Sequence, residues 1–247
     1  GNLKNAFPEK SNKEIKALGK RFYRHLSDVM IENVVSLFMK PQRIKNFVSI
    51  RNIEVVNRLY EKNKNITGII GHYGNWEFLT TVPPYTPYAI LSVYKPLKNK
   101  FFDRKTYEMR RKQEAIPVPK KKVYKYAMQY ETSKQPYVLG LVSDQAPPKK
   151  NIDYWTTFLN QETAFFNGPE KIARRFNHAV IFTVVDKIKR GQYEIRFVVL
   201  FENAASTTDN EITEAYKNEL EKTIRKKPEY WLWSHRRWKH SRKKLNS

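Results

Sequence analysis

A histidine and a glutamate with four residues between them form the most chemically suggestive pair in the chain. His72 and Glu77 enclose the sequence Tyr-Gly-Asn-Trp and directly follow a short apolar run at 66–71. A histidine that is oriented by a carboxylate can act as a general base. The chain has no cysteine, and no serine stands in a Gly-x-Ser-x-Gly context. We therefore expect the base to activate a hydroxyl or amine that arrives with a substrate.

The local structure decides whether these two side chains can meet. On one continuous helix they would be separated by about 140° around the axis. If a strand ends at His72 and a helix begins near Asn75, Gly74 supplies the turn and Glu77 can reach the imidazole. Glu77 then lies in the first turn of that helix, where the helix dipole favours a carboxylate. The alternative is a packed histidine beside a solvated glutamate.

Three further groups come directly after predicted strands or before a predicted helix. Lys95 and Lys98 flank a proline and could bind a phosphate, although a solvated basic loop would look the same. Asp144 and Gln145 follow a strand, at the edge where open α/β sheets place ligands, unless Asp144 only caps a loop. The segment 163–170 could line an acyl pocket and offer backbone N–H groups to an oxyanion or phosphate, or be an ordinary buried start of a helix.

The charge of the chain indicates an anionic partner. Lys and Arg number 47 against 24 Asp and Glu, a formal net charge of +23. Nucleic acid, anionic lipid and phosphorylated substrates all fit such a surplus. The segment 225–247 has nine basic residues and one acidic residue, and it carries Trp231, Trp233 and Trp238. Tryptophans among cations suit a membrane interface or stacking on bases. The absence of cysteine excludes disulfides, thiolate zinc sites and cysteine catalysis.

The sequence shows neither a transmembrane helix nor a signal peptide. The longest stretch without Asp, Glu, Lys or Arg, Phe78 to Tyr94, is interrupted by three prolines. Because the chain opens on Gly1 without a methionine, an upstream membrane anchor stays an open expectation.

Apolar periodicity, caps and turn residues predict alternating helices and strands. Helices are predicted at 11–38, 52–61, 75–81, 99–113, 123–132, 167–176 and 209–226, and strands at 66–71, 88–94, 137–143, 179–185 and 193–201. This alternation predicts a single α/β domain over 1–247, built on a mixed, mostly parallel sheet flanked by helices and closed by an antiparallel hairpin. Residues 1–50 are expected to form an N-terminal helical appendage, and 51–247 the core.

Motif residues occur along the chain in one recognisable order. The blocks are 2–9, His72 to Glu77 with Asn75 and Trp76 inside, Tyr94-Lys95-Pro96 with Asn99, Asp103 and Arg110, then Asp144-Gln145, Gly168, and the C-terminal blocks 228–233 and 235–238. In order and spacing they resemble the bacterial lipid A late acyltransferases (lauroyl/myristoyl transferases) of the lysophospholipid acyltransferase superfamily. The resemblance spans nearly the whole chain. It departs from the family at Lys95, which replaces the usual arginine, at 112–115, which lacks the usual glycine, and in the loop 146–148.

The resemblance implies a glycerolipid acyltransferase-like fold and a mechanism that needs no metal or cofactor. His72 would take the proton from an acceptor hydroxyl, with Glu77 orienting the imidazole, and the hydroxyl would attack an acyl thioester of acyl carrier protein or coenzyme A. Arg110 and backbone donors near Gly168 would stabilise the oxyanion or phosphate charge. The substrate-binding residues implied are Asn75, Trp76, Lys95, Asn99, Arg110, Asp144, Gln145 and Gly168.

The resemblance also implies the partners and the location. The partners are acyl carrier protein, a phosphorylated glycolipid acceptor (a lipid A precursor) and an anionic membrane surface. The location is the cytoplasmic face of the bacterial inner membrane. No nucleic acid is expected as a partner. Three alternatives stay open. The acceptor could be another amino or hydroxy lipid. A basic nucleic-acid-binding protein would explain the charge and tryptophans but not His72 and Glu77. A metal-dependent hydrolase using that pair as ligands lacks an obvious third ligand.

Overall fold

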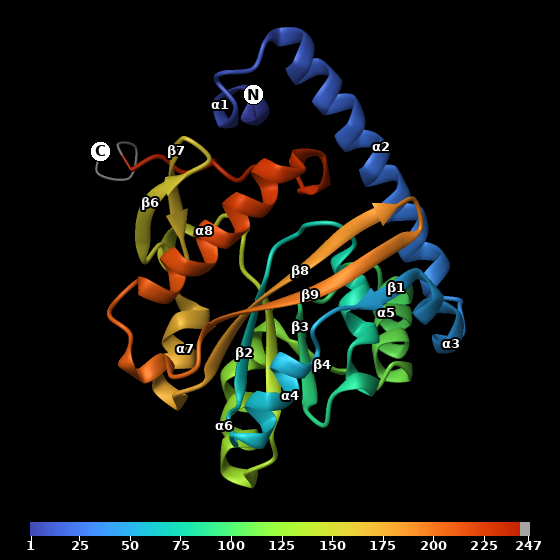
Figure 1. Cartoon of the computed structure of the whole chain (residues 1–247), viewed down its shortest axis with the longest axis vertical. Coiled ribbons are helices and arrows are strands. Elements are labelled where there is room, and N and C mark those ends of the chain that lie inside the picture. Colours follow the sequence, from blue (N-terminus) through green and yellow to red (C-terminus); the bar gives the residue numbers. More distant parts are fainter. Residues whose placement is uncertain (243–247) are drawn as a thin grey trace.

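A seven-stranded, mostly parallel sheet forms the centre of the molecule in the computed structural model, which describes residues 1–242 (Figure 1). The strand order is β1-β9-β8-β2-β5-β3-β4, and β6 and β7 form a separate two-stranded hairpin. The strands are β1 (Val48–Ile50), β2 (Ile66–Ile70), β3 (Ala89–Tyr94), β4 (Ile116–Pro119), β5 (Tyr137–Val142), β6 (Tyr154–Phe158), β7 (Gln161–Phe165), β8 (Ala179–Lys189) and β9 (Gln192–Phe201). The helices are α1 (Asn2–Ala6), α2 (Asn12–Ser36), α3 (Pro41–Ile44), α4 (Glu54–Glu61), α5 (Lys100–Lys112), α6 (Val123–Ser133), α7 (Gly168–Phe176) and α8 (Glu211–Lys226).

The predicted fold class is confirmed. The sheet is parallel apart from the antiparallel pairing of β8 with β9, which is the predicted hairpin. Helix α2 begins with a capping box, in which Ser11 Oγ accepts from the Glu14 N–H and the Glu14 carboxylate accepts from the Ser11 N–H. The sequence patterns missed β1, β4 and the β6–β7 hairpin.

The first 50 residues are part of the same core as the rest of the chain. Leu18 and Phe22 of α2 are buried in one apolar cluster with Trp231 and Leu220. Strand β1 pairs in parallel with β9 and completes one edge of the sheet. The predicted appendage is therefore packed onto the core, because the inner stripe of α2 has an apolar surface to cover.

Helices cover both faces of the sheet. On one face, Val56 and Leu59 of α4 pack against Ile66 and Ile181. On the other face, Ala127 of α6 packs against Leu139 of β5. Strands β2 and β5, which are buried on both faces, read as continuous apolar runs, as expected for central parallel strands.

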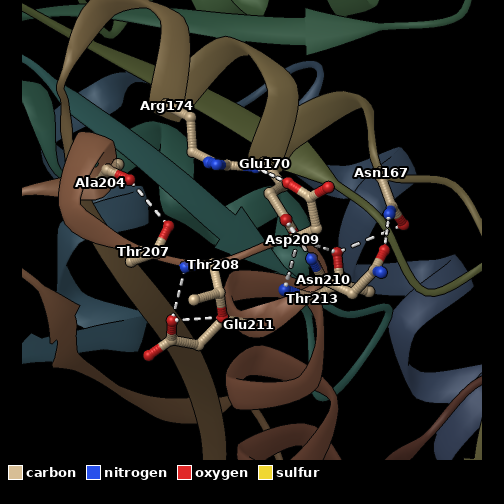
Figure 2. A network of polar contacts seen from close by, with 10 residues as sticks. All are labelled: Asn167, Glu170, Arg174, Ala204, Thr207, Thr208, Asp209, Asn210, Glu211 and Thr213. Carbon is tan, nitrogen blue, oxygen red and sulfur yellow. Dashed lines mark hydrogen bonds and ion pairs between the residues drawn. The ribbon is translucent and has the colours of Figure 1, made fainter.

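A polar network joins the N-termini of α7 and α8 (Figure 2). The buried Glu170 of α7 accepts hydrogen bonds from the backbone N–H of Asn210 at 2.6 Å and of Thr213 at 2.9 Å. Asn210 lies at the N-cap position of α8, but its side chain does not cap the helix. Glu170 satisfies the free N–H groups of the first turn instead, which fixes α7 and its glycine end relative to α8.

None of the helices within residues 1–242 is long and apolar enough to cross a bilayer.

Gly74 is the residue at which a side chain would do most damage to the turn after β2. Its φ is +61°, its N–H donates to Tyr230 O at 3.0 Å, and an added Cβ would lie 1.9 Å from Val185 O. We expect Gly74→Ala to lower the free energy of unfolding by about 2–4 kcal/mol, because it adds a backbone clash to an unfavourable φ. Urea unfolding measures this. Gly19→Ala in α2, where an added Cβ would make an ordinary contact with the Leu3 side chain at 3.9 Å, is the control and should be neutral or stabilising by up to about 1 kcal/mol.

Candidate active site

His72 and Asp144 lie side by side at the carboxyl ends of two neighbouring parallel strands. Ile70 of β2 is paired with Val142 of β5, so the residues two positions further on reach the same level of the sheet edge. His72 Nδ1 is 2.6 Å from Asp144 Oδ1, and the His72 backbone N–H donates to Asp144 Oδ2 at 2.8 Å. The carboxylate that orients the histidine is therefore Asp144, which the sequence had placed among the substrate-binding residues.

Asp144 is held as a buried carboxylate. Its side chain is 2% exposed, and Oδ2 also accepts from Trp231 Nε1–H at 2.7 Å. Burial opposes ionisation, but the charge of His72 and the hydrogen bonds from His72 and Trp231 outweigh it, so the pKa of Asp144 lies below its ordinary value. A charged Asp144 in this position can stabilise an imidazolium as it forms.

The second ring nitrogen of His72 is the one available to a substrate. His72 lines a cavity, and its Nε2 is 3.3 Å from the amide nitrogen of Gln145. With Nδ1–H donated to Asp144, neutral His72 carries its lone pair on Nε2, where a general base needs it. Trp76 packs edge-to-face on the imidazole, with 4.8 Å between ring centroids.

The pKa of His72 reflects two opposing effects. Burial by itself lowers the pKa, whereas the charge and hydrogen bond of Asp144, with a further contribution from the charge of Glu77, raise it. The raising effects prevail, and the pKa of His72 lies above its ordinary value of 6.5. The imidazole is thus a stronger base than a free histidine side chain.

Glu77 makes its close contacts with Arg110. Arg110 Nη2 lies 3.0 Å and 2.9 Å from the two carboxylate oxygens of Glu77, and the guanidinium lies over the Tyr94 ring at 5.2 Å. The predicted contact of Glu77 with the imidazole is therefore wrong, although the charge of Glu77 contributes to the raised pKa of His72. The turn differs from the prediction as well, because 76–81 forms a short 3₁₀ helix, η2 (Trp76–Thr81), which is followed by two prolines.

Arg110 retains unused hydrogen-bond donors. It is 7% exposed, and its Nε and Nη1 atoms are buried without an acceptor among the described residues. Arg110 also lines the cavity. A buried guanidinium with unpaired donors is costly unless an acceptor arrives, so this side chain is ready to bind an anionic oxygen.

The cavity beside His72 has a volume of about 840 Å³. Much of its lining is apolar, with the partly buried Leu79 and Ile90 and the buried Met109 and Ala115 among the residues that form it. Lysines occur at its exposed rim. An apolar interior with a few polar groups at one end suits a ligand that has a long apolar part and a polar head.

The remaining predicted site residues divide into two groups. Lys95, Gln145 and Gly168 line the cavity, and Gly168 provides room for the Phe166 ring, since an added Cβ would lie 2.1 Å from that ring. Asn75 and Asn99 do not line it. Asn75 is fully buried and donates to Glu32 at 3.0 Å, and Asn99 caps α5 by accepting from backbone N–H groups.

The C-terminal segment packs against the turn that carries His72. The backbone of 72–74 is bonded to it through Gly74 N–H to Tyr230 O and Leu232 N–H to His72 O. Trp231 and Trp233 are buried, and Trp238 is partly buried with its N–H donated to Thr163, so these tryptophans do not form the membrane or stacking surface that the sequence suggested. Trp231, which donates to Asp144, was not among the site residues predicted from the sequence. Its signal was its place in the block 228–233.

Among residues 1–242, no three His, Asp or Glu side chains are grouped so that they could hold a metal ion.

A histidine paired with a buried carboxylate lies beside a largely apolar cavity with cationic donors, at the carboxyl edge of a mostly parallel α/β sheet. This arrangement is typical of an enzyme site that can activate a nucleophile beside an apolar ligand. The family model described as bacterial lipid A biosynthesis acyltransferase matches residues 1–240. The chain belongs to this family and is an acyltransferase.

Two curated relatives agree with this assignment. The chain is 21% identical over 240 residues to the lipid A biosynthesis palmitoleoyltransferase of Escherichia coli (strain K12), covering 96% of this chain and 76% of the relative. The same figures hold for the lipid A biosynthesis acyltransferase of Shigella flexneri. Both alignments run through the His72 and Asp144 regions, because they span nearly the whole chain.

Proposed function

We propose that this acyltransferase moves a fatty acyl chain from a thioester to a hydroxyl of a phosphorylated glycolipid of the lipid A type, with His72 as the general base. The observation that carries the proposal is the pairing of His72 with the buried Asp144, which leaves Nε2 facing a large cavity with an apolar interior. The family assignment and the names of the relatives support the lipid A type of acceptor.

In the proposed reaction, His72 Nε2 takes the proton of the acceptor hydroxyl as its oxygen attacks the thioester carbonyl carbon. A C–O bond forms, and the carbonyl oxygen becomes an oxyanion. When the intermediate collapses, the C–S bond breaks and the imidazolium returns its proton to the leaving thiolate. Asp144 stabilises the imidazolium between these two steps, and the ester and the free thiol account for all atoms.

Arg110 is proposed to bind the negative charge of the substrates. Its buried Nε and Nη1 groups, which lack a partner in the described part of the chain, can donate hydrogen bonds to a phosphate or to the developing oxyanion. Glu77 holds the guanidinium in place, and Lys95 adds a cation at the rim of the same cavity. The backbone N–H groups at Gly168, the first residue of α7, offer a further place for an oxyanion.

We propose acyl carrier protein as the donor partner and an anionic membrane surface as the place of action. The support is the net charge of +23, which attracts both an acidic carrier protein and anionic lipid head groups.

The test is mass spectrometry of a phosphorylated glycolipid acceptor after incubation with acyl carrier protein thioester. A mass gain of one acyl chain is expected. Consumption of the thioester without a mass gain would show that the acceptor is wrong but the chemistry right. If neither the acceptor nor the thioester changes, the proposal fails. Acyl coenzyme A is the parallel donor and distinguishes the two thioesters.

Glu77→Gln separates the role proposed for Glu77 from that of Asp144. We expect it to lower kcat/KM for the phosphorylated acceptor about 10–100-fold, because a neutral amide no longer holds the Arg110 guanidinium. The effect should fall mainly on KM and should be much smaller for an acceptor without phosphate. Steady-state kinetics with both acceptors measure it. If Glu77→Gln lowers kcat as much as Asp144→Asn does with either acceptor, Glu77 orients the base after all.

A further inference from the structure

Helix α2 exposes apolar side chains on the outer side of its C-terminal half. On the inner side of this half, Val29 is buried together with the polar residues His25 and Asp28. On the outer side, Met30 is 63% exposed, Ile31 58%, and Phe38, just beyond the helix, 65%. The outer side of a surface helix in a water-exposed protein normally carries charged and polar residues. Something apolar is therefore expected to cover this outer side.

The exposed apolar side chains of α2 continue onto the start of α5 across the mouth of the cavity. Figure 1 shows the C-terminal end of α2 on the same side of the molecule as α5. Val34 and Leu37 from the α2 side and Leu97 and Phe102 from the α5 side line one cavity. We call this surface the rim patch, defined as Met30, Ile31, Val34, Val35, Phe38, Leu97, Phe101 and Phe102, all of which are exposed.

Lysines border the rim patch. Lys95, Lys98, Lys100, Lys120 and Lys121 are exposed, and Lys95, Lys120 and Lys121 line the cavity as well. Within residues 1–242, no carboxylate lies within 4.0 Å of the ammonium group of any of these five lysines. An apolar patch with unneutralised cations at its edge complements an anionic lipid bilayer, in which apolar groups enter the acyl region and ammonium groups meet phosphates.

The same charges argue against a second copy of the chain as the occupant. A two-fold symmetric contact through the rim patch would place one set of lysines against or beside the same set from the other copy. Like charges facing each other across an interface are unfavourable.

We infer that the rim patch docks on an anionic bilayer, so that the mouth of the cavity opens directly onto lipid. Its use as the entrance for the acceptor rests on the proposed function. In that arrangement the acyl chains of the acceptor stay in the bilayer while its head group reaches His72. The docking itself depends only on the exposed side chains and lysines.

The test is co-sedimentation with vesicles of phosphatidylethanolamine and phosphatidylglycerol. The triple variant Met30→Gln/Ile31→Gln/Phe38→Gln changes positions outside the cavity lining. It should lower the vesicle partition coefficient by at least roughly 30-fold, because each substitution removes the favourable transfer of an apolar side chain from water to lipid. The single variant Met30→Gln has a matched control in Met128→Gln on α6, outside the rim patch and the cavity lining, where Met128 is 38% exposed. The control should change binding less than about twofold.

A second pair of variants tests the lysines. Lys98→Gln/Lys100→Gln should weaken binding to anionic vesicles by about fivefold per lysine and have little effect on vesicles of phosphatidylcholine. Lys222→Gln/Lys226→Gln on α8 removes the same charge from another face and should have a much smaller effect. Equal losses from both pairs would show non-specific attraction and overturn the assignment of the surface.

Two further measurements keep the outcomes distinct. If the triple variant binds vesicles as wild type does, the inference fails. If sedimentation velocity shows a wild-type dimer that the triple variant loses, the occupant is a second copy. Transfer to acceptor in detergent micelles should survive in the triple variant. Vesicle binding without any transfer by the wild type would refute the proposed function and leave the docking surface standing.

Discussion

His72→Ala should lower the rate of acyl transfer by about 10²–10⁴-fold, because it removes the group proposed to take the proton from the acceptor hydroxyl. His72 is the histidine that lines the cavity in the described part of the chain. Its Nδ1 is paired with Asp144, so its Nε2 is the ring nitrogen left for a substrate. The measurement is the mass gain of the acceptor per unit time at saturating thioester.

The control for this variant is its fold. The His72 side chain is 16% exposed and packs against Trp76, so circular dichroism and thermal unfolding should accompany the assay. His72→Gln, which keeps much of the side-chain volume, should be as inactive as His72→Ala. Transfer within tenfold of wild type by a folded variant would show that His72 is not the base.

Asp144→Asn should have the second largest effect, a loss of about 10²–10⁴-fold in kcat with little change in the volume of the site. An asparagine cannot stabilise the imidazolium, and its NH₂ group competes with Nδ1–H and favours the wrong tautomer. The backbone N–H of His72 and the Trp231 N–H also lose their charged acceptor.

The pH dependence distinguishes this role from a merely structural one. In the wild type the pKa of His72 lies above 6.5. The rate of transfer should fall as the pH drops through this raised pKa, because the base becomes protonated. Asp144→Asn removes the charge that raises this pKa and leaves the lowering effect of burial. The acid limb of the residual activity should therefore move to lower pH. Trp231→Phe, which deletes one hydrogen bond to Asp144, should move it less.

An acid limb that stays in place in Asp144→Asn would contradict the pairing of His72 with Asp144. An alkaline shift of the limb would contradict it as well, because loss of a neighbouring carboxylate cannot raise the pKa of an imidazole through charge.

The strands and helices of the core were predictable because their signals are local. The apolar runs 66–70 and 137–142 form β2 and β5, and the capping box at Ser11 begins α2. The missed elements have weak local signals. β4 reads Ile-Pro-Val-Pro and lies at the edge of the sheet, where prolines are tolerated, and β1 has three residues. Their pairing with neighbouring strands stabilises them.

The predicted helix after His72 fails for a related reason. Residues 76–81 lead directly into Val82-Pro83-Pro84, and the chain forms η2, a short 3₁₀ helix, where the prediction expected an α-helix. A proline restricts the residue before it and cannot donate to the preceding turn, so a full α-helix has no room to form. Glu77 consequently points to Arg110, which reaches it from α5.

From the sequence alone, His72 is predicted as the base, the family blocks are recognised, and His72 and Asp144 are placed directly after two apolar strands. The net charge and the tryptophan-rich C-terminus are also read directly from it. Which carboxylate pairs with His72 depends on the order of the strands in the sheet, and strand order is not a local property of the sequence. β2 and β5 are neighbours with Ile70 opposite Val142, and that register brings two residues 72 positions apart to 2.6 Å, while Arg110 takes the carboxylate that lies nearer in sequence. Burial of Trp231 and exposure of the α2 surface follow from the same packing.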